Sequence, residues 1–430
     1  MNISNQRNKP CWCGSGIKYK KCHLQKEKEL KVPSYKIHND FKNSLKHKEC
    51  KVPSELTHEC SDKIIKAHTI SKSANLKNIA REGKVYGMTS DMLDVEGDSN
   101  PIKLALIHIN QASIFYIFCS KHDKELFSPL EDVEFIFSNE QIFLLAYRTV
   151  AKAMYLKEQQ VKMFSENVST YDKSFTNKSQ QTYIQLISHM FSDEESQLGD
   201  IRRIKQVFDN DLLASEHDNI KYYCILIDKV PEIMMAGVFN PDRDFDGNVL
   251  VDYVNNPSKE YNAILTSIIK IKDNGVIIFS WNSRIQSQEC DIFIQSLHNL
   301  KNEDKVKAIT CLLLKKNNEN LYFSPSWYET LDSNKKKLVD ESYVLDETIK
   351  HTDEEIEKLL NSDMTLLPSF FKNLDRDAQK ELLNNIPIKD DDISKFHEYD
   401  LFDWEILSIK TNIKEVESSL PLEAIAETKA

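Results

Sequence analysis

The chain has 430 residues, too many for one typical globular core, so we expect two or three domains. Glycine is scarce, at 9 residues, and the glycine motifs of P-loop and Rossmann proteins are absent, which argues against nucleotide enzymes of those classes. No apolar run is long enough to span a membrane and the N-terminus lacks the apolar segment of a signal peptide, so the sequence predicts a cytoplasmic protein.

The formal net charge of −11 is unevenly distributed. Residues 1–48 carry 12 Lys and Arg against 3 Asp and Glu, whereas residues 340–430 carry 23 acidic against 10 basic residues. A basic head can contact an acidic partner, namely nucleic acid, the ribosome or an acidic protein surface, and the acidic end repels such partners. The alternative is that both are solvated surfaces.

In chain order, the sequence predicts an α+β protein of six segments. Residues 1–24 form a small zinc knuckle, 25–47 a charged linker, 48–137 a second Cys/His zinc module that is treble-clef-like, 138–215 a region of long helices, 216–285 an antiparallel sheet, and 286–430 a helical, acidic C-terminal region.

Hydrophobic patterning predicts the elements of the last three segments. Helices are expected over 139–164, 183–213, 292–300, 305–314 and 354–360, and strands over 222–227, 249–254, 263–271 and 276–281. The residues from Lys272 to Gly275 are typical of a hairpin turn. A weakly ordered tail is expected after Leu407.

The cysteines are concentrated near the N-terminus. Six of the nine lie in the first 119 residues, and in a reducing compartment such a cluster favours metal binding over disulfides. The other three, Cys224, Cys290 and Cys311, lie singly in apolar sequence and fit small buried hydrophobic residues.

Four residues near the N-terminus supply a complete tetrahedral ligand set for Zn²⁺: Cys11, Cys13, Cys22 and His23. The sequence Gly14-Ser15-Gly16 after Cys13 permits the tight turn that such a knuckle needs. Because so short a segment cannot bury a core of its own, metal binding would supply its folding energy.

These residues resemble the SEC-C motif, the zinc knuckle found at the C-terminus of the preprotein translocase SecA and in many otherwise unrelated bacterial proteins. The resemblance covers residues 8–23 and matches all four ligands position by position. In SecA the motif contacts a chaperone and the ribosome. No translocase ATPase follows it here, so the resemblance implies zinc and a contact surface but not secretion.

Lysines surround this knuckle, and two aromatic residues, Trp12 and Tyr19, are interleaved with them. The lysines are Lys9, Lys18, Lys20 and Lys21. Cations beside aromatic rings suit contact with RNA or phosphate. Alternatively, the two rings pack over the zinc site as its only hydrophobic core.

A second metal site is predicted further along the chain, from five candidate ligands: Cys50, Cys60, His68, Cys119 and His122. Cys119 and His122, spaced as CxxH, can face one metal ion from the start of a helix, and two upstream residues would complete a second zinc site. Five candidates for four positions mean that one has another role.

This Cys/His segment is similar to treble-clef and HNH-type segments. Residues 50–157 also resemble an uncharacterised group of bacterial proteins that often carry SEC-C, which implies no activity. In an HNH-like nuclease, one that would act in defence against foreign DNA such as that of a phage, His68 would be the general base, with Asp123 or His108 as a partner. Ala67 stands at the position where HNH nucleases have a ligand of the catalytic metal. The alternative for His108 is a buried histidine with a structural role.

Three interpretations of this second site therefore stay open: a structural zinc site, a nuclease centre and a site without metal. The leading hypothesis for function is a binding or adaptor protein that acts through its basic knuckle. The alternative hypothesis is the metal-dependent nuclease.

Overall fold

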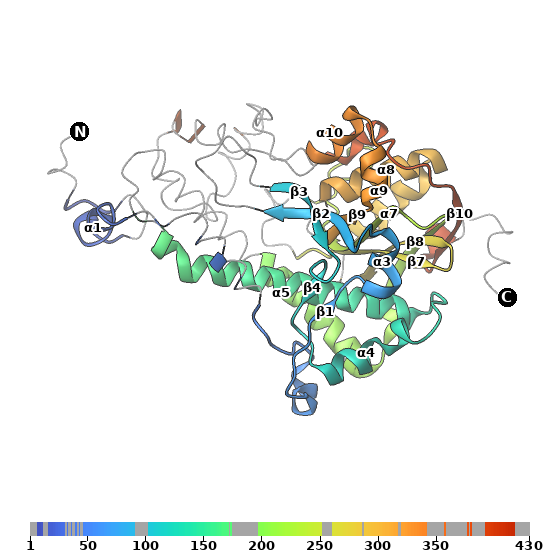
Figure 1. Cartoon of the computed structure of the whole chain (residues 1–430), viewed down its shortest axis with the longest axis horizontal. Helices are drawn as coiled ribbons and strands as arrows, with labels where there is room; N and C mark the ends of the chain where they lie inside the picture. The colour runs from blue at the N-terminus through green and yellow to red at the C-terminus, as the bar shows by residue number, and fades with distance from the viewer. Residues whose placement is uncertain are drawn as a thin grey trace.

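An antiparallel sheet of eight strands organises the chain (Figure 1). This computed structural model describes residues 7–11, 16–30, 32, 36, 39–40, 43, 46–90, 102–171, 173, 197–251, 260–285, 288–316, 320–341, 357, 376–377, 379–380 and 392–417. From one edge of the sheet to the other the strands are β10 (Ile406–Thr411), β5 (Ile220–Ile227), β8 (Asn274–Asn282), β7 (Ile264–Ile271), β6 (Ile233–Phe239), β9 (Leu321–Phe323), β2 (Lys84–Ser90) and β3 (Ile102–His108).

Helices cover both faces of this sheet. The long helix α5 (Asn139–Tyr171) and a helix over residues 197–214 pack on one face, and α7 (Glu289–Asn299) and α8 (Asn302–Lys316) pack on the other (Figure 1). Neighbouring residues of β7, such as Ile264 and Leu265, therefore enter opposite cores. Since both faces are buried, the central strands read as continuous apolar runs rather than as an apolar and polar alternation.

The predicted turn between two of these strands is confirmed. β7 and β8 form a hairpin in which Ile271 lies opposite Asn274, so the loop consists of Lys272 and Asp273. Lys272 has φ of 53°, the left-handed conformation that two-residue hairpin turns require. The helices predicted over 139–164, 292–300 and 305–314 are likewise present as α5, α7 and α8.

Two other predictions are wrong where the structure describes them. Residues 249–251 form no strand, since Val249 makes only an isolated bridge to Arg243, and residues 252–254 lie outside the described part. The tail after Leu407 is ordered to residue 417, because β10 pairs with β5 and is followed by α14 (Lys414–Glu417). Ile406 and Ile409 of β10 pack against the core, although the region is acidic overall. The helix expected over 183–213 is present over residues 197–213, whereas residues 183–196 lie outside the described part, as does the helix expected over 354–360 apart from residue 357.

The Cys/His segment forms a small unit against α5. In it the short strand β1 (Ala67–His68) pairs with β4 (Ile114–Phe115), and α4 (Ser120–Glu131) follows. The rings of Phe118 and Tyr147 stack at 6.3 Å between centroids, joining this unit to α5. Other short elements are η3 (Ser54–Glu59), η4 (Lys72–Leu76), α3 (Lys77–Ile79), η5 (His217–Asn219), α9 (Pro325–Thr330), α10 (Ser333–Glu341) and η8 (Ile393–Glu398).

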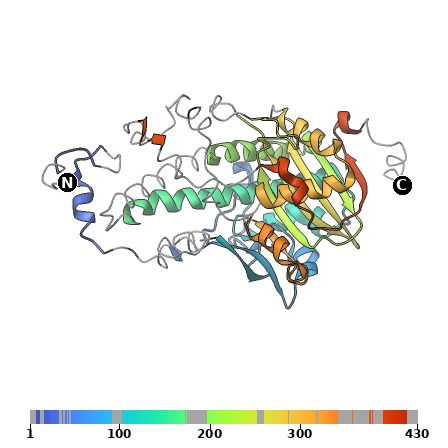
Figure 2. The same cartoon turned by 90° about the horizontal axis from the view of Figure 1, so that it is seen from above.

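The hairpin of β2 and β3 is joined to the main sheet through β9. This three-residue strand pairs with β6 on one side and with β2 on the other, although more than 200 residues separate it from β2. Figure 2 shows that α5 extends well beyond the sheet at one end. Among the described residues, no helix has both the length and the apolar character that crossing a membrane requires.

Candidate metal centres

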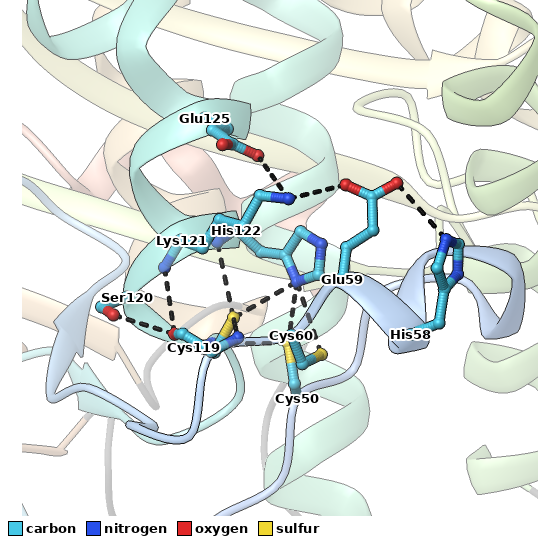
Figure 3. Close-up of polar contacts among 10 residues, drawn as sticks. Cys50, His58, Glu59, Cys60, Cys119, Ser120, Lys121, His122 and Glu125 are labelled. Atoms are coloured by element: carbon cyan, nitrogen blue, oxygen red, sulfur yellow. Dashed lines mark hydrogen bonds and ion pairs between the residues drawn. The ribbon is translucent and has the colours of Figure 1, made fainter.

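Four of the five predicted ligands of the second site converge on one point. Cys50, Cys60, Cys119 and His122 each offer one ligand atom, and these atoms all lie within 4.8 Å of one another (Figure 3). Cys50 lies before η3 and Cys60 directly after it, while Cys119 caps the start of α4 and His122 lies in its first turn. The CxxH spacing thus places both of its members at the start of a helix, as predicted.

The distances within this group fit a tetrahedral metal ion of the size of zinc. His122 Nδ1 lies 3.5 Å from Cys50 Sγ, 3.5 Å from Cys60 Sγ and 3.3 Å from Cys119 Sγ. Zinc bonds of 2.3 Å to sulfur and 2.0–2.1 Å to nitrogen at tetrahedral angles place these atoms about 3.5 Å apart. The side chains are therefore positioned to hold an ion between them, with Nδ1 as the imidazole ligand.

Backbone N–H groups stabilise negative charge on two of the sulfurs. Cys119 N donates to Cys50 Sγ at 3.3 Å, while Ser61 N and His122 N donate to Cys119 Sγ at 3.4 and 3.5 Å. Burial acts to raise the pKa of Cys119, but the hydrogen bonds from His122 and Ser61 outweigh it and lower the pKa to about 6. Burial raises the pKa of Cys50 to about 12. Cys119 therefore ionises first.

Contacts around the ligands hold the two halves of the group together. The side chain of Lys121 pairs with Glu59 at 2.7 Å, and the Ser61 and Ser120 hydroxyls lie 2.9 Å apart. A backbone bridge joins Ile64 to Cys119. Sequence reasoning missed Ser61 as a sulfur hydrogen-bond donor, because any residue other than proline can supply that N–H.

His68, the fifth candidate, lies outside this group. Its position on β1 turns the ring toward the β3 end of the hairpin, where Nε2 lies 3.3 Å from the carbonyl oxygen of Ile109. Burial lowers the pKa of His68, and the positive charges of Lys66 and Lys72 lower it further. His108, which the sequence also placed in a core, is exposed at the end of β3, because the alternating run forms an edge strand.

At the N-terminus, three of the four predicted ligands come together. Cys11 Sγ and Cys22 Sγ each lie 3.2 Å from His23 Nδ1, and the three form a second group able to hold a metal ion. Cys13, the fourth predicted ligand, lies outside the described residues. The segment consists of a bridge between Pro10 and Lys18, then η2 (Tyr19–Lys21) and α1 (His23–Lys26).

The surface of this knuckle is basic, and one of its two aromatic residues is inside. Tyr19 is buried and its hydroxyl donates to Glu27, so its ring packs within the knuckle. Trp12 lies outside the described residues. Of the four predicted contact lysines, Lys20 is half-buried, and Lys9, Lys18 and Lys21 are exposed.

Comparison with protein families locates one match in the chain. Residues 7–25 match the SEC-C motif. The match spans Cys11 to His23, so the resemblance drawn from the ligand spacing is confirmed, and it covers only the knuckle. No curated protein and no solved structure matches the chain.

Proposed function

We propose that this chain is a zinc-binding cytoplasmic adaptor whose SEC-C knuckle contacts an acidic partner, either nucleic acid, the ribosome or an acidic protein surface. One observation carries the proposal. The knuckle uses its Cys and His side chains and Tyr19 for its own interior and leaves Lys9, Lys18 and Lys21 exposed. A small folded segment that exposes lysine side chains and buries its Tyr19 ring is suited to contact with a negatively charged surface.

The second centre supports a binding protein rather than an enzyme. With zinc bound, three thiolates and one imidazole from Cys50, Cys60, Cys119 and His122 would fill a tetrahedral coordination sphere. Structural zinc sites are closed in this way, whereas catalytic zinc sites keep a position open for water or substrate. The nuclease hypothesis requires His68 beside a catalytic ion, and His68 lies in neither group of ligands that the described residues form.

Metal analysis tests the two-zinc proposal. We expect two zinc ions per purified chain and one in the double variant Cys11→Ser/Cys22→Ser, because the two ligand groups share no residue. The thermal unfolding of the body should be unchanged, since the second group stays intact. Zinc is measured by plasma mass spectrometry on protein freed of loosely bound metal. A chain that holds one zinc ion or none would refute the proposal.

Neutralising the positive charges of the contact surface tests the adaptor role separately. The triple variant Lys9→Gln/Lys18→Gln/Lys21→Gln should weaken binding to bacterial ribosomes, to RNA or to an acidic protein, and the wild-type affinity should fall steeply with salt. The matched control, Lys36→Gln/Lys46→Gln/Lys48→Gln, removes the same charge from exposed lysines that follow the knuckle. Equal loss in both variants would show that only net charge matters, and the knuckle would then have no specific role. Binding is measured by co-sedimentation and fluorescence polarisation across a salt series.

A further inference from the structure

Basic side chains from three separate segments meet at the base of the β2–β3 hairpin. Lys66 precedes β1, Lys72 begins η4, and Lys84 begins β2, and all three are exposed. Two histidines lie among them, His68 on β1 and His108 at the end of β3. We call these five residues the hairpin patch.

Direct contacts connect the members of the patch. The side-chain nitrogen of Lys66 donates to the carbonyl oxygen of Asn110, and the N–H of Asn110 donates to His108 Nδ1 at 3.1 Å. Lys84 lies directly opposite His108 in the β2–β3 register, so the two side chains share one face of the hairpin. Lys66 and Lys72 flank His68 in the chain, two residues before it and four residues after it, and His68 Nε2 lies 3.3 Å from the carbonyl oxygen of Ile109, the residue next to Asn110.

The positive charge of the patch is not neutralised by neighbouring carboxylates. In the part of the chain that the structure describes, Lys66, Lys72 and Lys84 form no ion pair, whereas nearby Arg81 pairs with Glu329. Residues 63–84 contain six Lys and Arg and only one acidic residue, Glu82, in a chain of net charge −11. This local excess of basic residues is visible in the sequence itself. It marks one area to which a polyanion would be drawn.

Aromatic and apolar side chains continue the same face. Tyr86 follows Lys84 by two residues and therefore points to the same side of β2, opposite Leu106 on β3. Tyr86 is only half-buried, Leu106 is 46% exposed, and the Tyr86 ring lies 4.6 Å from that of Tyr328. Lys84 and the pair of tyrosine rings thus offer a cation for phosphates and aromatic faces for unpaired bases on one side of the hairpin.

We propose that the hairpin patch, with Tyr86, binds single-stranded nucleic acid: Lys66, Lys72 and Lys84 contact phosphates, and Tyr86 stacks on a base. An acidic protein would use the lysines without needing the rings, and a duplex would hide the base faces that Tyr86 requires. This surface is separate from the knuckle, so the inference goes beyond the proposed function and does not depend on it.

The test is a titration of the full zinc-loaded chain against labelled single-stranded RNA, single-stranded DNA and the matching duplex. The variant Lys66→Gln/Lys72→Gln/Lys84→Gln should bind about 100-fold more weakly at about 0.1 M salt, because each contact to single-stranded phosphate contributes about 0.7 to the salt slope. For the same reason, the slope itself should fall by about 2. The control variant Lys124→Gln/Lys301→Gln/Lys414→Gln removes equal charge from exposed lysines elsewhere and should bind nearly as well as wild type.

A second variant separates stacking from charge. Tyr86→Leu should weaken single-strand binding about 5- to 150-fold with an unchanged salt slope, as expected for loss of one stacked base. Zinc content and the thermal transition of each variant establish that it is folded. Equal binding by the lysine variant and its control would overturn the proposal. It would also be overturned if Tyr86→Leu bound the single strand as tightly as wild type and the wild-type chain bound polyglutamate as tightly as it binds the single strand. Repeating the titration in the Cys11→Ser/Cys22→Ser background distinguishes this surface from the knuckle, because hairpin-patch binding should persist there.

Discussion

Replacing His122 with alanine should remove one zinc ion and unfold the unit that carries the second centre. The imidazole is buried, with 3% of its surface exposed, and its Nδ1 lies within 3.5 Å of all three thiols of the group. Structural zinc contributes about 10–16 kcal/mol of apparent binding free energy at neutral pH. Because a whole domain is stable by only about 5–15 kcal/mol, loss of the ion removes most or all of the stability of this unit.

The consequence should extend beyond the ligands themselves. Val52, Phe118 and Phe127 belong to the same buried cluster as the inner face of α5, so an unfolded Cys/His unit would expose that face. We expect His122→Ala to aggregate or to lose its cooperative thermal transition. The matched variant His122→Cys keeps four ligands and should retain two zinc ions. Zinc stoichiometry and circular dichroism during heating distinguish the two variants.

A control residue separates metal loss from ordinary core damage. Cys290 is fully buried and lies outside both ligand groups. Its replacement by alanine should leave zinc content at the wild-type value and reduce stability only by the small cost of a missing sulfur. If His122→Ala kept two zinc ions and a normal thermal transition, the second centre would not be a zinc site.

The pairs of candidate ligands that are close in sequence were predictable because they depend on local chemistry. The CxxH pair beginning a helix and the CxC and CH pairs of the knuckle each place their donors within a few residues of one another. The choice among the upstream candidates was not predictable, because it depends on where η3 and β1 lie in three dimensions. η3 returns Cys60 to Cys50, while β1 carries His68 toward Ile109.

Three adjacent strands of the sheet were predictable, and the others were not, including β6 beside them. β5, β7 and β8 are long apolar runs, and both of their faces are buried whichever strands adjoin them. β9 has only three residues, too short for a periodic signal, and its partners β2 and β6 are distant in sequence. Such pairings depend on the packing of the whole chain, and a local sequence pattern therefore cannot predict them.

Replacing Asp209 with asparagine should destabilise the chain by about 3–5 kcal/mol, the usual effect of removing one partner of a buried ion pair. The side chain of Lys205, on the helix over residues 197–214, is 2% exposed and pairs with Asp209 one turn later. Its side-chain nitrogen also donates to the Tyr147 hydroxyl at 3.0 Å and to the carbonyl oxygen of Lys51, beside Cys50, at 3.1 Å. This contact connects the helix to the loop of the second metal centre.

The asparagine variant leaves the Lys205 ammonium buried without its counter-charge, so the double variant Lys205→Met/Asp209→Asn should recover much of the lost stability.

The direction in which the stability deficit of Asp209→Asn changes with pH also follows from this pair. Burial lowers the pKa of Lys205 in the folded state, and without Asp209 it should fall further. The unfolded chain then binds more protons at this site, so stability rises with pH, and the deficit of Asp209→Asn should be smaller at pH 9 than at pH 7. Urea unfolding at both pH values measures this, and a deficit below about 1 kcal/mol at pH 7 would show that the pair is not a buried charge pair in solution.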